Sequence, residues 1–142
     1  MQKLGCAILA FAAGFLSVVI FHQSAWALLH GAGVISAAQP PWPMDPIPPL
    51  GVPSLFSKGF WGGLWGVLIA WLLYGTRGTR YWALWTLLGA TLPPLVAILV
   101  IPPLKGLEIP PLWPRLAISS TVNAVWGLGT AALLRVLGRL RG

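Results

Sequence analysis

Four long apolar runs, separated by short segments that carry nearly every charge, dominate the hydrophobic pattern of the chain. A helix needs roughly 20 predominantly apolar residues to cross about 30 Å of hydrocarbon, and each run is near that length. The pattern therefore predicts an all-α membrane protein with four transmembrane helices in an antiparallel bundle, forming one integral membrane domain over residues 1–142. The predicted helices cover residues 4–29, 57–74, 81–102 and 116–134.

Composition independently favours a membrane protein. Of the 142 residues, 57% are hydrophobic and 8% are charged, against roughly 25% charged residues in soluble domains. A single cysteine, Cys6, excludes a disulfide within the chain and a thiolate metal cage made by one chain. The net charge of +7 does not indicate nucleic-acid binding, because the basic residues flank the helices instead of forming one stripe.

The distribution of Lys and Arg predicts the orientation in the membrane, since cytoplasmic segments carry an excess of both. Six of the nine basic residues fall near the chain ends or in the connection 75–80, whereas three basic residues and both acids fall on the other side. We therefore expect both termini in the cytoplasm and external loops at residues 31–56 and 103–115. The first group comprises Lys3, Arg77, Arg80, Arg135, Arg139 and Arg141, and the second comprises Lys58, Lys105, Arg115, Asp45 and Glu108.

The first apolar run has an alternative interpretation as a secretory signal peptide. Lys3 precedes it, and Ser24 to Ala27 resemble a small-x-small cleavage site. The apolar run of 18 residues from Leu4 to Phe21 exceeds the usual 7 to 15. We expect this segment to be retained as a helix, whereas cleavage would leave three helices.

Both predicted external loops are rich in proline. Seven prolines fall within residues 31–56 and four within residues 103–115. Such density blocks regular hydrogen bonding and favours an extended polyproline conformation. The loops are predicted to form a packed cap over the helix ends, with recognition by a partner protein as the alternative.

Small residues four positions apart indicate two faces for close helix packing. In the second predicted helix, which we expect to begin with Ser57 as its N-cap, the small residues are glycines. In the fourth helix they are accompanied by a hydroxyl and by Asn123, whose side chain we expect to hydrogen-bond to another helix. These two faces are the best candidates for packing against each other. The packing residues are Gly59, Gly62, Gly63, Gly66, Ser119, Asn123, Gly127 and Ala131.

A candidate pocket follows from the depth of the irregular and polar positions. The pair Pro93 and Pro94 removes two amide donors from the third helix, so a kink is expected and the freed carbonyls need partners such as Thr91 or Asn123. At 1.5 Å per residue, Pro93, Pro94 and Asn123 lie roughly 8 to 14 Å below the external ends of their helices, with His22 nearer that surface. A ligand site is therefore expected, if anywhere, in the external half.

The sequence offers no recognisable catalytic or metal constellation. His22 and His30 stand about 12 Å apart along a helix, too far to hold one ion. An external enzyme using His30 and Asp45 is the weakest of the functional hypotheses, because their spacing matches no known arrangement. The expectation is a protein that is not an enzyme and has no metal and no cofactor.

Several short strings along the chain form a recognisable set. They are Phe21-His22-Gln23, Gly51-Val52-Pro53, Ser57-Lys58, the run 60–66, Pro103-Leu104-Lys105-Gly106, Val122-Asn123 and the run 126–130. Together they resemble an uncharacterised family of small bacterial multi-pass inner-membrane proteins with four helices. The resemblance spans most of the chain, and its Trp-Gly strings are its most specific part. It implies a four-helix protein of the bacterial inner membrane and carries no activity or cofactor.

Two functional hypotheses follow. The first is a non-catalytic accessory, assembly or structural subunit that acts through helix packing, as a homo-oligomer or in a larger membrane complex. The alternative is a small carrier or ligand-binding protein with a pocket in the external half. An offset of 61 between Trp65-Gly66 and Trp126-Gly127 also suggests a parallel internal repeat, although the first and third helices do not keep this offset.

Overall fold

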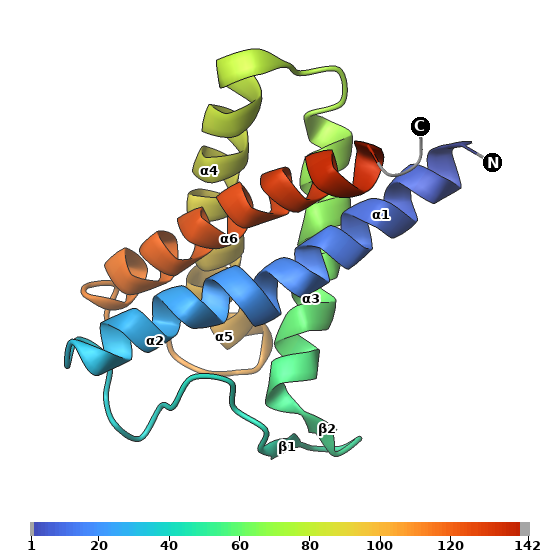
Figure 1. Ribbon diagram of the computed structural model, residues 1–142. Helices are drawn as coiled ribbons and strands as arrows, with labels where there is room; N and C mark the ends of the chain where they lie inside the picture. The colour runs from blue at the N-terminus through green and yellow to red at the C-terminus, as the bar shows by residue number, and fades with distance from the viewer. Residues whose placement is uncertain (1, 140–142) are drawn as a thin grey trace.

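The computed structural model describes residues 2–139 and is all-helical apart from one very short hairpin (Figure 1). The first long helix consists of three consecutive segments, α1 (Gln2–Ser17), the π-helical segment η1 (Val18–His22) and α2 (Gln23–Gly31). The loop after it contains β1 (Pro46–Ile47) and β2 (Val52–Pro53), which pair antiparallel with Ile47 opposite Val52. Backbone pairing thus occurs within the proline-rich loop, where the sequence predicts only extended chain.

The remaining helices follow with one short and one longer connection. They are α3 (Ser54–Leu72), then α4 (Gly78–Leu95) continuing into the π-helical η2 (Val96–Val100) and α5 (Ile101–Leu104), and finally α6 (Arg115–Arg139). Four helical spans, Leu4–Gly31, Ser54–Leu72, Gly78–Leu104 and Arg115–Gly138, are long and apolar enough to cross a membrane. The chain therefore has the helices of a multi-pass membrane protein.

Two predicted local features differ from the structure. Helix α3 begins at Ser54, one turn before the predicted N-cap, so Ser57 lies inside the helix. The amide of Ser54 donates instead to the carbonyl of Asp45 at 2.9 Å, so the loop provides the partner that a cap would provide. Helix α4 also continues through Pro93 and Pro94, and the departure from α-helical geometry comes immediately afterwards, in η2.

The helices pack in the spatial order α3, α1, α6, α4. Helix α1 contacts both α3 and α6, and α6 contacts α4, whereas α3 and α4 make few contacts with each other. In Figure 1, α1 and α6 run side by side across the front while α3 and α4 lie more steeply behind them. The four helices therefore form an open arrangement, in which the space between α3 and α4 is not closed by direct helix packing.

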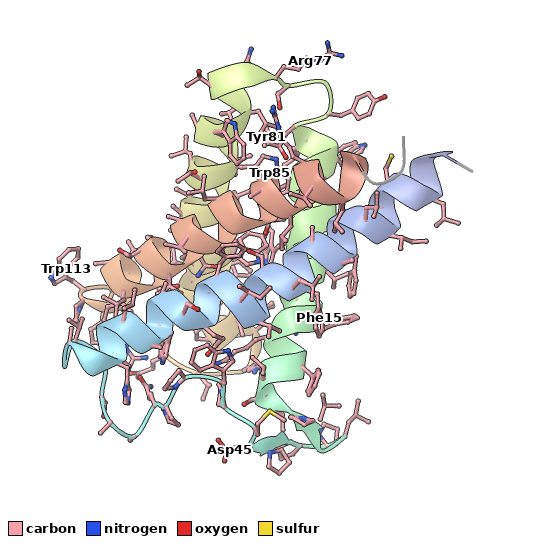
Figure 2. The ribbon with its side chains drawn as sticks, viewed as in Figure 1. Phe15, Asp45, Arg77, Tyr81, Trp85 and Trp113 are labelled. Carbon is pink, nitrogen blue, oxygen red and sulfur yellow. The ribbon has the colours of Figure 1, made fainter. Side chains whose placement is uncertain are left out.

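The start of α1, the end of α6 and the short turn between α3 and α4 lie on one side of the molecule (Figure 1). The two longer loops lie on the other side. Figure 2 shows Arg77 in the short turn and Asp45 in the first loop, at opposite ends of the molecule. Near the first end, the guanidinium of Arg135 lies 4.7 Å from the Tyr81 ring centroid and 5.3 Å from that of Trp82, a cation–π arrangement between α6 and α4.

The glycines of α3 pack mainly against α1, although a Cβ atom at Gly62 would also lie 3.3 Å from the indole Nε1 of Trp126 on α6. A Cβ atom at Gly66 would lie 2.7 Å from the carbonyl oxygen of Ala10, and one at Gly62 would lie 3.1 Å from that of Gly14. Gly59 and Gly63 lie under aromatic rings of α1. The expected mutual packing of the two small-residue faces is therefore wrong, because each face has a different partner.

The partner of the α6 face is α4. A Cβ atom at Gly127 would lie 3.3 Å from the Cα of Gly89, and one at Gly89 would lie 2.8 Å from the carbonyl oxygen of Asn123. Ala131, one turn further on, is fully buried, and its carbonyl accepts a hydrogen bond from the Tyr81 hydroxyl at 3.0 Å. The two close-packed pairs are thus α1 with α3 and α4 with α6.

Trp126 joins these two pairs along the contact of α1 with α6. Its indole Nε1 donates to the Gly14 carbonyl at 2.9 Å, and its own carbonyl accepts from the Ser17 hydroxyl at 2.7 Å. Trp126 is 1% exposed and belongs to the buried core, together with Ile69 and Trp85. Interhelical hydrogen bonds in a membrane contribute about 0.6 to 2 kcal/mol each, so this residue fixes the register of α6 on α1.

Candidate functional site: a cavity between α3 and α4

A cavity of about 560 Å³ occupies the space that α3 and α4 leave open. Helix α3 forms one wall, and the segment from the end of α4 through η2 to α5 forms the opposite wall. Side chains of η1, α2 and α6 form its floor. The lining residues used below are His22, Trp26, Ser57, Lys58, Leu64, Trp65, Leu68, Pro93, Val96, Ala97, Asn123 and Trp126.

The end of the cavity nearer the first loop is polar. Lys58, an exposed residue in the second turn of α3, places its amine 5.7 Å from the ring centroid of Trp26. The same Trp26 ring stacks on the imidazole of His22, with centroids 6.4 Å apart and an interplanar angle of 6°. Lysine, indole and imidazole from two different helices therefore meet at this end of the cavity.

The first loop holds this polar end in place. Gln23 bonds the Nδ1 of His22 at 3.3 Å through its amide nitrogen, and its amide oxygen accepts from the backbone amide of Trp42 at 2.8 Å. The indole of Trp42 donates to the carbonyl of Val19 at 2.8 Å, inside η1. Because a π-helical segment disturbs the regular backbone ladder, this bond from the loop supports the irregular turn directly.

A second set of bonds ties the loop to the neighbouring helices. The indole of Trp26 donates to the carbonyl of Gln39 at 3.0 Å. The carbonyl of Pro43 accepts from both the hydroxyl of Ser54 and the amide of Leu55, each at 2.9 Å. The loop is therefore packed over the ends of α2 and α3, next to the polar end of the cavity.

The other end of the cavity is apolar and open at its rim. Leu64 and Leu68 on α3 line it, and they are 41% and 40% exposed. Ala97, on η2, lines the opposite wall and is also exposed. The rim thus presents apolar side chains from two of the helices that are long and apolar enough to cross a membrane.

Both π-helical segments of the described chain line this one cavity. Residues Val18 and His22 come from η1, and Val96 and Ala97 come from η2. π-Helical turns are rare and are frequently found at functional sites, because the wider turn reorients side chains that a regular helix would point elsewhere. Their convergence from two separate helices marks the cavity as the site of interest.

The structure brings together three of the five residues of the predicted pocket. His22, Pro93 and Asn123 line the cavity, whereas Thr91 and Pro94 do not. The hydroxyl of Thr91 donates to the Leu87 carbonyl at 2.8 Å, within its own helix, and Pro94 is buried. Thr91 therefore does not serve the carbonyls that the two prolines release.

Asn123 does not make the expected hydrogen bond to another helix. Its amide nitrogen donates to the carbonyl of Ser119 at 2.9 Å and lies 3.5 Å from the hydroxyl of the same residue, one turn earlier in α6. The amide oxygen takes part in neither bond. Because the side chain also lines the cavity, this oxygen is a candidate acceptor for a bound molecule.

Sequence reasoning missed Lys58, Ser57, Trp26 and Trp126 as parts of one site. It assigned Ser57 and Lys58 to the helix end and to the charge balance, because the predicted helix began at residue 57. With α3 beginning at Ser54, Lys58 lies one turn inside the helix. The available signal was Ser54 directly before the apolar Leu55 and Phe56, since a serine at this position is a common helix start.

The remaining candidate groups do not converge on this cavity. Asp45 lines a neighbouring cavity of about 260 Å³, which Lys58 and Trp26 also border, and His30 lines neither cavity. Over residues 2–139, no three side chains of the types His, Cys, Asp and Glu come together in a way that could hold a metal ion. His30 and Asp45 thus share no cavity.

Comparisons with protein-family models, with curated proteins and with solved structures find no match for this chain. The resemblance of its Trp-Gly strings to small four-helix inner-membrane proteins stays a prediction. Any functional conclusion therefore depends on the geometry and chemistry of the cavity.

Proposed function

We propose that this chain is a multi-pass protein of the bacterial inner membrane that binds a small amphipathic molecule in the cavity between α3 and α4, without catalysing a reaction. The single observation that carries the proposal is the polarity gradient of the cavity. Lys58 and His22 lie at one end, and Leu64, Leu68 and Val96 lie further along it. A molecule with a polar head and an apolar tail matches this order.

The size of the cavity supports a small molecule as the occupant. Binding sites for small molecules usually measure about 300 to 1,000 Å³, and about 560 Å³ falls within this range. A helix about 10 Å wide rises 1.5 Å per residue, so the same volume would hold only about five residues of a partner helix. A transmembrane helix of another subunit is therefore a poor fit.

The proposed orientation places the chain ends and the turn between α3 and α4 in the cytoplasm. Arg77 and Arg80 lie at that turn, and Arg135 lies at the same end of the molecule. The loops that carry Asp45 and Glu108 would then be external. The polar end of the cavity would lie near the external surface of the membrane, where lipid head groups are found.

An accessory or assembly role is the other hypothesis from the sequence, and it was based on the two small-residue faces of the second and fourth predicted helices. Those faces are occupied within a single chain, by α1 against Gly62 and Gly66 and by α4 against Gly127. An oligomer or a larger complex would need other surfaces. The binding proposal consequently has the stronger physical support.

Photolabelling of the purified protein in lipid nanodiscs tests the binding proposal. The probes are hexadecyl phosphate, hexadecanol and hexadecyltrimethylammonium, each with a diazirine at the same mid-chain carbon. Labels should concentrate on peptides of α3 and of the segment 93–101. Replacing Ala97 by Phe fills part of the cavity and should lower this labelling about fivefold or more, which corresponds to about 1 kcal/mol.

The matched control is Ala83→Phe, because Ala83 lies on α4 and is exposed like Ala97 but does not line the cavity. This variant should label like the unchanged protein. Labels spread evenly over all lipid-facing helices, and equally in both variants, would show that the cavity binds none of these molecules.

A further inference from the structure

The charge at the polar end of the cavity is positive and has no acidic partner in the cavity. Lys58 lines the cavity, and neither of the two acidic residues of the chain, Asp45 and Glu108, does so. Among the described residues, no acidic side chain lies within 4.0 Å of the lysine amine. A cation at the edge of an apolar cavity attracts an anion more strongly than a cation in bulk water does, because the lower effective dielectric strengthens the Coulomb interaction.

Asp45 lies near this lysine but outside the larger cavity. It lines the smaller neighbouring cavity, on the loop side, together with Lys58 and Ser54. Lys58 therefore stands between the two cavities. The groups that face the larger cavity beside it are Ser57, His22 and Trp26, none of which carries a negative charge.

The apolar part of the cavity has the length of a lipid tail. Lys58, at the polar end of the cavity, and Leu68, at the apolar end, are separated by about 15 Å along α3, at 1.5 Å per residue. No Lys, Arg, Asp or Glu lines this stretch apart from Lys58 itself. A free inorganic anion would use only the polar end, whereas a lipid would use both ends.

From this arrangement we propose that the ligand is an anionic lipid with a single apolar chain. Lys58 binds its acidic head group, with Ser57 and His22 as further hydrogen-bonding groups, and the chain lies along Leu64 and Leu68. The proposal rests on the binding function above and adds the charge of the ligand and the residue that selects it. Lys58 thereby becomes the determinant of specificity.

The same three probes measure the selectivity, because they differ only in the charge of the head group. The concentration of hexadecyl phosphate needed for half-maximal labelling should be about tenfold lower than that of hexadecanol, as expected for a hydrogen bond to a charged group. The trimethylammonium probe should label the cavity least. Lys58→Met should remove the preference for phosphate, and Lys58→Arg should restore most of it.

Two controls keep the result interpretable. Lys105→Met removes a lysine from the other long loop, which does not line the cavity, and should leave the preference unchanged. Labelling by hexadecanol should persist in Lys58→Met, which shows that the variant is folded and that its cavity is open. An excess of inorganic phosphate should not displace hexadecyl phosphate, because the tail provides much of the affinity.

The outcomes separate this inference from the function on which it rests. Equal labelling of the cavity by all three probes would overturn the selectivity for anions while leaving a binding cavity. Full displacement by inorganic phosphate would overturn the lipid and indicate a site for a free anion. Absence of cavity labelling by every probe would overturn both proposals.

Discussion

The contact between Gly127 of α6 and Gly89 of α4 provides a quantitative test of the helix packing. A Cβ atom at position 127 would overlap the carbonyl of Trp85 and lie 3.3 Å from the Cα of Gly89. Both obstacles are backbone atoms, which cannot rotate away as a side chain does. Gly127→Ala must therefore push α4 and α6 apart.

The expected magnitude follows from two opposing effects. Overpacking of this kind costs about 1 to 3 kcal/mol. Alanine also stabilises a helix relative to glycine by up to about 1 kcal/mol. We expect Gly127→Ala to lower the free energy of unfolding by about 1 to 2 kcal/mol.

Gly138→Ala is the matched control on the same helix, because a Cβ atom there meets nothing within 4 Å. This change should leave the stability unchanged or raise it slightly, with a smaller gain because position 138 is in the last turn of α6. Reversible unfolding by sodium dodecyl sulfate in mixed micelles, followed by circular dichroism, measures both. Equal stability of the two variants would refute the close packing of α4 on α6.

Two further predictions concern the topology and the first loop. The first uses single-cysteine variants in a background without the native cysteine. A cysteine in place of Ala38 should react with a membrane-impermeant maleimide in intact spheroplasts, whereas a cysteine in place of Thr76 should react only after permeabilisation. The reverse pattern would show that the proposed orientation is inverted. Trp42→Phe removes the indole bond to the Val19 carbonyl, so hydrogen exchange around residues 38–45 should rise about fivefold, for a bond of about 1 kcal/mol. Trp113→Phe, at a side chain that is 75% exposed, should not change that exchange, and an equal rise in both would contradict the role of the Trp42 bond.

The four helices could be predicted from the sequence because the length of each apolar run is set by the thickness of the membrane. The partners of the helices could not. Glycines four apart, such as Gly62 and Gly66, indicate that a backbone approaches closely, but the spacing does not say which one. The choice of α1 depends on Gly14 and on the rings of Phe11 and Phe15, which cover the glycines of α3.

Of the candidate site, only its position along the helices could be predicted from the sequence. His22, Pro93 and Asn123 line the cavity because irregular and polar positions gather in the half of the molecule nearer the long loops. Lys58 was missed because the start of α3 depends on carbonyls of the loop, at Pro43 and Asp45, that lie near Ser54 only in the folded chain. The π-helical segments were also missed, since they follow from how the helices pack and leave no periodic pattern.

The two Trp-Gly pairs with an offset of 61 have different environments. Both tryptophans line the cavity, but Trp126 is buried in the contact of α1 with α6, whereas Trp65 is only partly buried. In a parallel repeat, the contact of α1 with α6 would have its counterpart in a contact of α4 with α3. The first contact is extensive and the second is slight, so the cavity lies where that symmetry is lost.

Residues such as Leu64 and Ala97 form the exposed rim of the cavity. If a ligand enters past this rim from the membrane, the affinity that it needs is lower than for a ligand dissolved in water. A molecule that arrives by diffusion in the plane of the membrane is far more abundant around the protein than its dissolved amount would suggest. A dissociation constant near 1 mM, or only about 4 kcal/mol, can then suffice for substantial occupancy. Occupancy of such a site would follow the lipid composition of the membrane, and a search for tight binding in water would overlook it.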